Sequence, residues 1–251
     1  MRLIDEGGWG RDELTLLAPR AELAEVAEFF WIEEWTRRPR AGRYRIVADD
    51  APHILWHVEG RRHRVERFGL IGARTAHHDI DVSSRVLTVG VRLRPGVLPM
   101  LLNQSARRFT DRSVPFPLPL PRRRFMSPEL LVDDLTTILG EHTRRAVPAF
   151  LRRVRVLDPC ARDSVGALAR ELGASERTLR NLSHDHLGMG LKRFMKIRRL
   201  HAAMRLHQRA PAQSWSRVAS ECGYADQAHL IRDCRSLLGE SPATFSRRSR
   251  D

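Results

Sequence analysis

Two groups of polar side chains, fifty residues apart, have the hydrogen-bonding chemistry needed to read the edges of nucleic-acid bases. The first group is Arg177, Arg180 and Asn181. The second group is Gln227, Ala228, His229, Ile231 and Arg232. Arginine pairs bidentately with guanine, and asparagine or glutamine with adenine, in the major groove of DNA. To do so, both groups must project outward from a positioned element.

A short repeat predicts such an element in both places. The sequence LARELG at residues 168–173 returns as VASECG at residues 218–223. In each copy an apolar residue is followed by alanine, and an acidic residue, an apolar residue and a glycine come next. The small and apolar residues would form the buried face of a helix, and the glycine allows the tight turn that follows. Each copy is therefore predicted to open a helix-turn-helix.

A second helix is predicted after each turn. Ser175 and Asp226 mark its start, because their side-chain oxygens can accept hydrogen bonds from the free backbone N–H groups of a first helical turn. Apolar residues recur at three- or four-residue spacing and are expected to face the core. They are Leu179, Leu182, Leu230, Cys234 and Leu237. The base-reading groups are left on the outward face.

Residues 191–208, between the copies, are predicted to form a connecting helix with one apolar stripe. At about 1.5 Å per residue it spans roughly 27 Å, enough to hold two recognition helices in successive major grooves about 34 Å apart. Each copy closes with Leu-Gly, and Ser241-Pro242 is expected to begin a short last helix. The candidate phosphate contacts are Ser175, Lys192, Arg193, Lys196, Arg198, Arg199 and Arg235.

Over about its last ninety residues, the chain resembles the AraC/XylS family of bacterial transcription regulators. The more diagnostic part lies in the second copy and includes Gly223-Tyr224, Asp226-Gln227, His229-Leu230, Leu238-Gly239 and Ser241-Pro242. Two positions stand out. The family usually has phenylalanine where this chain has Cys234, and the smaller side chain would pack less apolar surface. Asp233 is expected to place a negative charge next to the contact surface.

Composition agrees with a polyanionic partner. The formal net charge is +14, and from residue 160 onward 17 basic residues face 9 acidic ones. However, 42 of the 44 basic residues are arginine, which a GC-rich genome would produce without any selection for nucleic acid. No apolar run approaches a membrane span and the N-terminus is unlike a signal peptide, so we expect a cytoplasmic bacterial protein. The three cysteines lack metal-site spacing and are expected to be reduced and structural.

The N-terminal region has a different hydrophobic period. Residues 21–35 fit either an amphipathic helix or, from Phe29 to Trp35, a strand. The segments RYRIV, HILWHVEG, RVERFGLIG and RVLTVGVRLRPG are typical of short antiparallel strands. The last of these, with the residues that follow, resembles the N-terminal domain of a subset of these regulators, in which a strand ends at Pro95-Gly96 and a short helix follows. Trp31, Trp35 and Trp56 could line a small pocket or fill a core.

Between the two regions, the run PFPLPLP at residues 115–121 is predicted to be an extended strap or linker. Ser127-Pro128 is expected to cap a helix whose apolar side contains Leu130, Leu131, Leu135, Ile138 and Leu139, and a second helix is expected near residues 148–157. These helices could form a dimer interface or pack within the chain.

Two histidine groups raise an alternative hypothesis, a metal-dependent small β-domain enzyme fused to a DNA-binding module. The groups are His53 with His57 and His63, and His77-His78 with Asp79. No acidic residue sits at a telling spacing from them, and no acid and base are paired as catalysis would require. We therefore predict no cofactor, no metal and no catalytic residue. The lack of cysteine before Cys160 also argues against a thiol-based sensor in this region.

The sequence therefore predicts an α+β chain in three parts. Residues 1–126 form a β-rich sensor, residues 127–157 a helical linker that could dimerise, and residues 158–251 a DNA-binding domain with two helix-turn-helix motifs. The predicted function is sequence-specific regulation of transcription, controlled by a signal at the N-terminal domain. Double-stranded DNA is the main predicted partner. RNA polymerase, a small-molecule effector or partner protein, and a second copy of the chain are further candidate partners, and a membrane is not.

Overall fold

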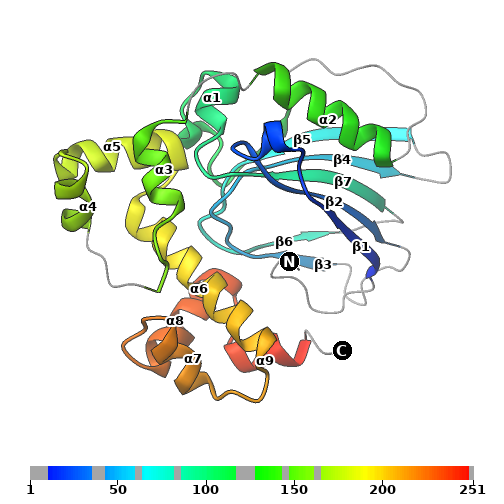
Figure 1. Ribbon diagram of the computed structural model, residues 1–251. Coiled ribbons are helices and arrows are strands. Elements are labelled where there is room, and N and C mark those ends of the chain that lie inside the picture. The colour runs from blue at the N-terminus through cyan, green and yellow to red at the C-terminus, as the bar shows by residue number, and fades with distance from the viewer. Residues whose placement is uncertain are drawn as a thin grey trace.

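A six-stranded antiparallel sheet forms the N-terminal part of the computed structural model, which describes residues 11–35, 43–59, 64–81, 86–116, 128–142, 147–160 and 165–248. Its strands are β1 (Arg11–Leu17), β2 (Ala27–Trp35), β4 (His53–Glu59), β5 (Arg64–Ile71), β7 (Val86–Leu93) and β8 (Ser113–Pro115), in the order β1-β2-β7-β4-β5-β8. Two further strands, β3 (Arg43–Ile46) and β6 (His78–Asp81), pair separately. Figure 1 shows this pair below the main sheet.

Alternating side chains give the main sheet two apolar faces. On one face Phe30, Ile54 and Val89 are buried with the leucines of a covering helix. On the other face Phe29, Trp31 and Leu55 form a smaller cluster. Position 90, on the strand next to Trp31, requires a glycine, because a Cβ there would lie 2.6 Å from the Trp31 ring. The β-rich prediction for this region is confirmed.

For residues 21–35 the strand alternative is correct and the helix is wrong. A single 3-10 turn, η1 (Ala21–Leu23), precedes β2. β2 lies between β1 and β7, so both of its edges are hydrogen-bonded and its side chains enter both clusters. A helix would bury only one face of this aromatic run. Strands β1, β6 and β8 were not predicted; β6 and β8 have only four and three residues, and β6 contains part of a histidine group.

The helices that follow the sheet keep their apolar faces inside the chain. α1 (Leu98–Leu102) and η2 (Ala106–Arg108) follow β7, as the resemblance implies. In α2 (Pro128–His142), Leu135, Ile138 and Leu139 pack on the sheet, whereas Leu130 is exposed. The leucines considered for a dimer interface are thus used, in the main, within the chain (Figure 1). The proline run from residue 117 to Pro121 and Ser127 lie outside the described residues.

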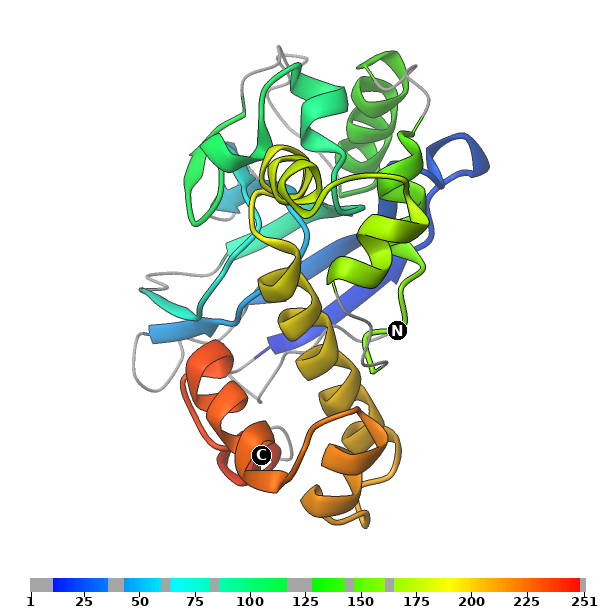
Figure 2. The same ribbon diagram turned by 90° about the vertical axis from the view of Figure 1, so that its left-hand side faces the viewer.

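The remaining helices form a second core. They are α3 (Ala149–Arg155), α4 (Val165–Glu171), α5 (Glu176–Leu187), α6 (Leu191–Arg209), α7 (Trp215–Glu221), α8 (Gln227–Leu238) and α9 (Pro242–Arg248). The α6 stripe of Phe194, Ile197 and Leu200 is fully buried in this core, and Figure 2 shows α6 running from α5 to α7. Both predicted helix pairs and the connecting helix are confirmed. None of the helices in the described ranges has the length and apolar character needed to cross a bilayer.

Candidate nucleic-acid interface

The two helix-turn-helix motifs have equivalent local geometry. The turn glycines Gly173 and Gly223 have φ values of +61° and +72°, a backbone conformation that other residues rarely adopt. The Ser175 hydroxyl oxygen accepts a 3.0 Å hydrogen bond from the backbone N–H of Thr178. The Asp226 carboxylate accepts a 2.6 Å bond from the backbone N–H of His229. Both recognition helices, α5 and α8, therefore start at the predicted capping residues.

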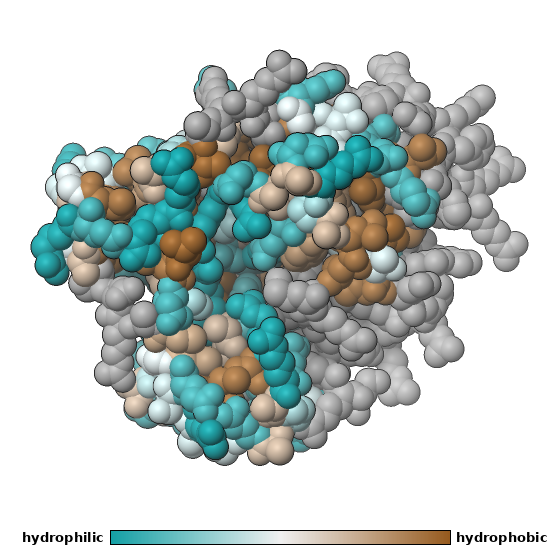
Figure 3. Space-filling view, in the orientation of Figure 1, coloured by the Kyte–Doolittle hydropathy of each residue, from teal (hydrophilic) through white to brown (hydrophobic). Residues whose placement is uncertain are grey.

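Most of the predicted base-reading side chains are exposed on the first two turns of these helices. The exposed residues are Arg177, Arg180, Asn181, Gln227, Ala228 and Arg232. His229 and Ile231 are half-buried, and the His229 ring packs edge-on against Tyr224 at 5.1 Å between ring centroids. The Ser216 hydroxyl donates to the Gln227 amide oxygen over 2.7 Å, which links α7 to the first residue of α8. Hydrophilic residues are prominent on the visible surface of α4 and α5 (Figure 3).

The cations of α6 differ in their surroundings. Lys192 is exposed, as is Arg235 on α8. Arg193 donates to the Thr75 carbonyl oxygen, and Arg198 donates to the carbonyl oxygens of Val154 and Arg155, at 3.1 Å each. Arg199 donates to the Pro159 carbonyl oxygen over 3.1 Å and lies over the Tyr224 ring. Periodicity alone gave no sign that these three arginines have partners inside the chain.

Asp233 lies inside the protein, between α8 and α6, although one of its carboxylate oxygens is 3.9 Å from the Nε2 of His229, a predicted base-reading residue. Its side chain is 6% exposed, and its carboxylate lies 2.7 Å from the Lys196 ammonium group. The pair joins α8 to α6, so Lys196 also has an internal partner. The neighbouring Cys234 is fully buried and fits the core without the usual phenylalanine, and burial raises the pKa of its thiol.

Comparison with known protein families matches both parts of the chain. Residues 168–248 match the family described as "Helix-turn-helix domain", and residues 15–115 match "Domain of unknown function (DUF6597)". The first match spans the repeat, and its two copies have the capped, paired helices described above. The chain belongs to the AraC/XylS family. It is therefore a DNA-binding transcription regulator.

Several solved structures are similar to this AraC/XylS regulator. A DNA-binding transcriptional dual regulator from Escherichia coli K-12 is 22% identical over 42% of this chain and 97% of that chain, with a TM-score of 0.37. ToxT from Vibrio cholerae is 10% identical over 87% of this chain and 98% of its own, with a TM-score of 0.48. ToxT bound to (E)-4-(8-methylnaphthalen-1-yl)but-3-enoic acid is 11% identical over 88% and 99%, with a TM-score of 0.49. Comparison with curated protein sequences gives no significant match.

The β-rich domain of this regulator contacts both helix-turn-helix motifs at equivalent points. Gly188, which ends α5 with φ of +78°, accepts a 2.8 Å hydrogen bond on its carbonyl oxygen from the Thr110 hydroxyl. Gly239, which ends α8 with φ of +78°, accepts a 3.4 Å bond from Arg45. Beside it, the Ala48 N–H donates to the Leu237 carbonyl oxygen over 3.1 Å. The exposed first turns of α5 and α8 take no part in these contacts.

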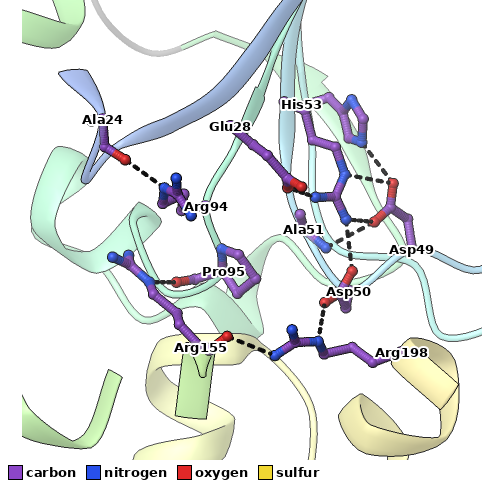
Figure 4. Close-up of polar contacts among 11 residues, drawn as sticks. Ala24, Glu28, Asp49, Asp50, Ala51, His53, Arg94, Pro95, Arg155 and Arg198 are labelled. Atoms are coloured by element: carbon purple, nitrogen blue, oxygen red, sulfur yellow. Dashed lines mark hydrogen bonds and ion pairs between the residues drawn. The ribbon is translucent and has the colours of Figure 1, made fainter. Parts of the chain in front are cut away.

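A charged cluster lies where the β-rich domain meets α6. Arg92 donates to Asp49 over 2.6 Å, to Asp50 over 2.7 Å and also to Glu28. Burial, together with the neighbouring Asp49, raises the pKa of Asp50 to about 7. Burial lowers the pKa of His201, on α6, to about 4, and its Nε2 lies 2.8 Å from the Ala48 carbonyl oxygen. Figure 4 shows Asp50 facing Arg198 and Asp49 turned toward His53.

The histidines singled out from the sequence do not gather into a metal site among the described residues. His53 lies 2.8 Å from Asp49 and so joins the charged cluster, whereas the side chains of His57 and His63 lie outside the description. The group whose ligand atoms come within 4.8 Å of one another is instead Asp49, Asp50 and His201. Its members come from both domains, a juxtaposition that sequence spacing could not reveal.

Proposed function

We propose that the regulator docks α5 and α8 in successive major grooves on one face of a DNA site. The observation that carries this proposal is that two helices, capped alike, present polar first turns while their C-terminal ends are held by the rest of the chain. The 19 residues of α6 span about 29 Å, close to the roughly 34 Å repeat of the groove. Base readout is assigned to Arg177, Arg180 and Asn181 in one motif and to Gln227, His229 and Arg232 in the other, with Ala228 and Ile231 beside them.

Phosphate contacts are assigned first to Lys192 and Arg235. Both are exposed, whereas Arg193, Lys196, Arg198 and Arg199 have partners within the chain. Ser175 is exposed as well, but its hydroxyl already caps α5. A cation that must leave an internal partner before it can neutralise a phosphate gains less from binding DNA.

The test is direct measurement of sequence preference. A binding site selected from random DNA is used in mobility-shift titrations with Arg180→Ala and Arg232→Ala, each of which should cost about 1–3 kcal/mol and relax preference at one or two base pairs. Arg152→Ala, an exposed change on α3, is the matched control. Equal losses on specific and random DNA would reassign Arg180 and Arg232 to the phosphates.

Control by a signal at the β-rich domain is the second part of the proposal. It is supported by the contacts of that domain with Gly188, Gly239 and α6, because a change at any of these points alters how the recognition helices are held. An effector acts only through its different affinity for two such arrangements. Contact with RNA polymerase and formation of a homodimer are further parts of the proposal.

Removal of residues 1–126 tests this control in cells. Expression of a reporter gene behind the selected site should then stop responding to conditions that change the output of the intact protein. A response that persists without these residues would refute the sensor assignment.

A further inference from the structure

A cavity of about 140 Å³ lies between the β-rich domain, α3 and α6. Cavities near 150 Å³ hold a molecule of about the size of benzene. Five arginines line it, namely Arg92, Arg94, Arg155, Arg198 and Arg205. They come from both domains, so a ligand here would touch the sensor and the DNA-binding part together.

Two of the five arginines lie close to the carboxylates of the cavity wall. Arg92 is bonded to all three carboxylates of the cavity wall, Glu28, Asp49 and Asp50. Arg198 donates to two carbonyl oxygens and lies 3.8 Å from Asp50. The three carboxylates of the cavity wall are thus paired without help from Arg94, Arg155 or Arg205.

Those three groups have hydrogen-bonding capacity left. Arg155 donates to the carbonyl oxygens of Pro95 and Glu25 and lies 3.3 Å from the Glu25 carboxylate, but its Nη2 is buried without a hydrogen-bond partner. Arg205 is half-buried and has no hydrogen bond or ion pair with any residue in the described ranges. Arg94 donates through Nε to the Ala24 carbonyl oxygen, and its guanidinium group lies on the same side of the cluster as Arg155 (Figure 4).

We propose that this cavity binds one small anion with a carboxylate or phosphate group, held by Arg94, Arg155 and Arg205. The planar guanidinium fork matches the oxygens of either group. Five arginines face three carboxylates of the wall, and Glu25 outside the wall pairs with Arg155, so one positive charge is left in excess and an anion would offset it. Inorganic phosphate or a short or aromatic monocarboxylate or dicarboxylate fits the volume.

A divalent cation is the competing occupant, since Asp49, Asp50 and His201 lie close enough to share one. Three features disfavour it. Arg92 already donates to both carboxylates, the His201 Nε2 faces a carbonyl oxygen and must carry its proton there, and further arginines line the same space. A cation would have to displace or repel these groups.

The bound anion would bridge Arg94, which follows β7, to Arg155 on α3 and Arg205 on α6. It would stabilise the arrangement in which the β-rich domain holds both recognition helices. This regulatory consequence rests on the proposed DNA-binding function, whereas binding of the anion does not.

The site is tested on the full chain by calorimetric titration and thermal denaturation. The probes are sodium phosphate, oxalate and benzoate, each compared with sodium chloride at the same ionic strength. At least one probe should bind saturably, one per chain, and raise the unfolding temperature. Arg94→Gln and Arg205→Gln should each weaken that binding about 10- to 100-fold, because each removes a charged hydrogen-bond donor. Arg209→Gln, an exposed change one turn further along α6, should leave the affinity as it is.

The proposal is overturned if none of the three anions binds saturably, or if both variants bind the probe as tightly as the natural chain. It is also overturned if Zn²⁺ or Mg²⁺ stabilises the protein and the anions do not. DNA affinity is measured separately with and without the probe. Saturable anion binding by a chain that fails to select a DNA sequence would refute the proposed function and leave the anion site standing.

Discussion

Lys196→Met distinguishes two roles for one cation on α6. The sequence predicts a phosphate contact, whereas the structure places the Lys196 ammonium group 2.7 Å from the buried carboxylate of Asp233. Removing one partner of a buried ion pair costs about 3–5 kcal/mol, since a charge is left without compensation. The Lys196 side chain is 32% exposed, so water screens part of this interaction. We therefore expect the free energy of unfolding to fall by about 2 kcal/mol.

The assay combines chemical and thermal denaturation with DNA titrations at several salt concentrations. For a domain of about 100 residues, the size of the C-terminal domain, a loss of about 2 kcal/mol lowers the Tm by roughly 8–16 °C. The salt dependence of DNA binding should stay unchanged in Lys196→Met. In Lys192→Met, the matched exposed change on the same helix, the slope of log K against log salt should fall by about 0.9, with little change in stability.

A double variant separates the lost pair from other effects of the substitution. Lys196→Met with Asp233→Leu should recover most of the stability, because a buried pair replaced by apolar side chains is often neutral. A stable Lys196→Met with a slope reduced by about one unit would refute the internal pairing and restore the phosphate role.

Three further predictions concern the core, the charged cluster and the domain contact. Because α3 packs into the C-terminal core, a fragment of residues 147–251 should melt at least about 5 °C above one of residues 158–251; equal melting temperatures would contradict that packing. The pKa of Asp50 is raised to about 7, so between about pH 4 and 7 the folded state binds a proton that the unfolded state has lost. The free energy of unfolding therefore falls as the pH rises through that window. The stability of Asp50→Asn relative to the natural chain should therefore rise from pH 4 to 7 in thermal denaturation, and a constant difference would exclude this titration. Gly239→Ala should reduce hydrogen-exchange protection of the Ala48 amide, because its Cβ would lie 2.6 Å from the His77 ring and 2.9 Å from the Arg45 guanidinium group that bonds to this end of α8. Gly173→Ala, with open space around its Cβ, should strain only its own turn. Protection that stays unchanged in Gly239→Ala would show that the contact does not depend on this glycine.

The features that could be predicted from the sequence are local ones. Caps such as Ser175 and Asp226, turn glycines and three- or four-residue spacing act within one or two helical turns, so the order of residues contains them. The alternation in β4, β5 and β7 is local in the same sense.

What the sequence did not reveal depends on contacts between distant residues. Asp233 looks exposed on a helical wheel drawn for α8 alone, and only the position of α6 makes it a buried partner of Lys196. Arg193 reads as a free cation until Thr75 is placed beside it, 118 residues earlier in the chain. The base-reading assignments rest on position and exposure, and they stay predictions until DNA binding is measured.

The paired contacts at Gly188 and Gly239 have a consequence for the phasing of the two readers on DNA. The C-terminal ends of both recognition helices are hydrogen-bonded to the β-rich domain. The angle between their N-terminal ends is therefore set by that domain as well as by α6. The major groove returns once per helical turn of about 10 base pairs, and two readers succeed together only when they match that period. Weakening the contact at either glycine would change the angle between the two recognition helices, although every base-contacting side chain would remain intact. The same protein could then tolerate a different spacing between half-sites, a change in target choice that requires no new base contact.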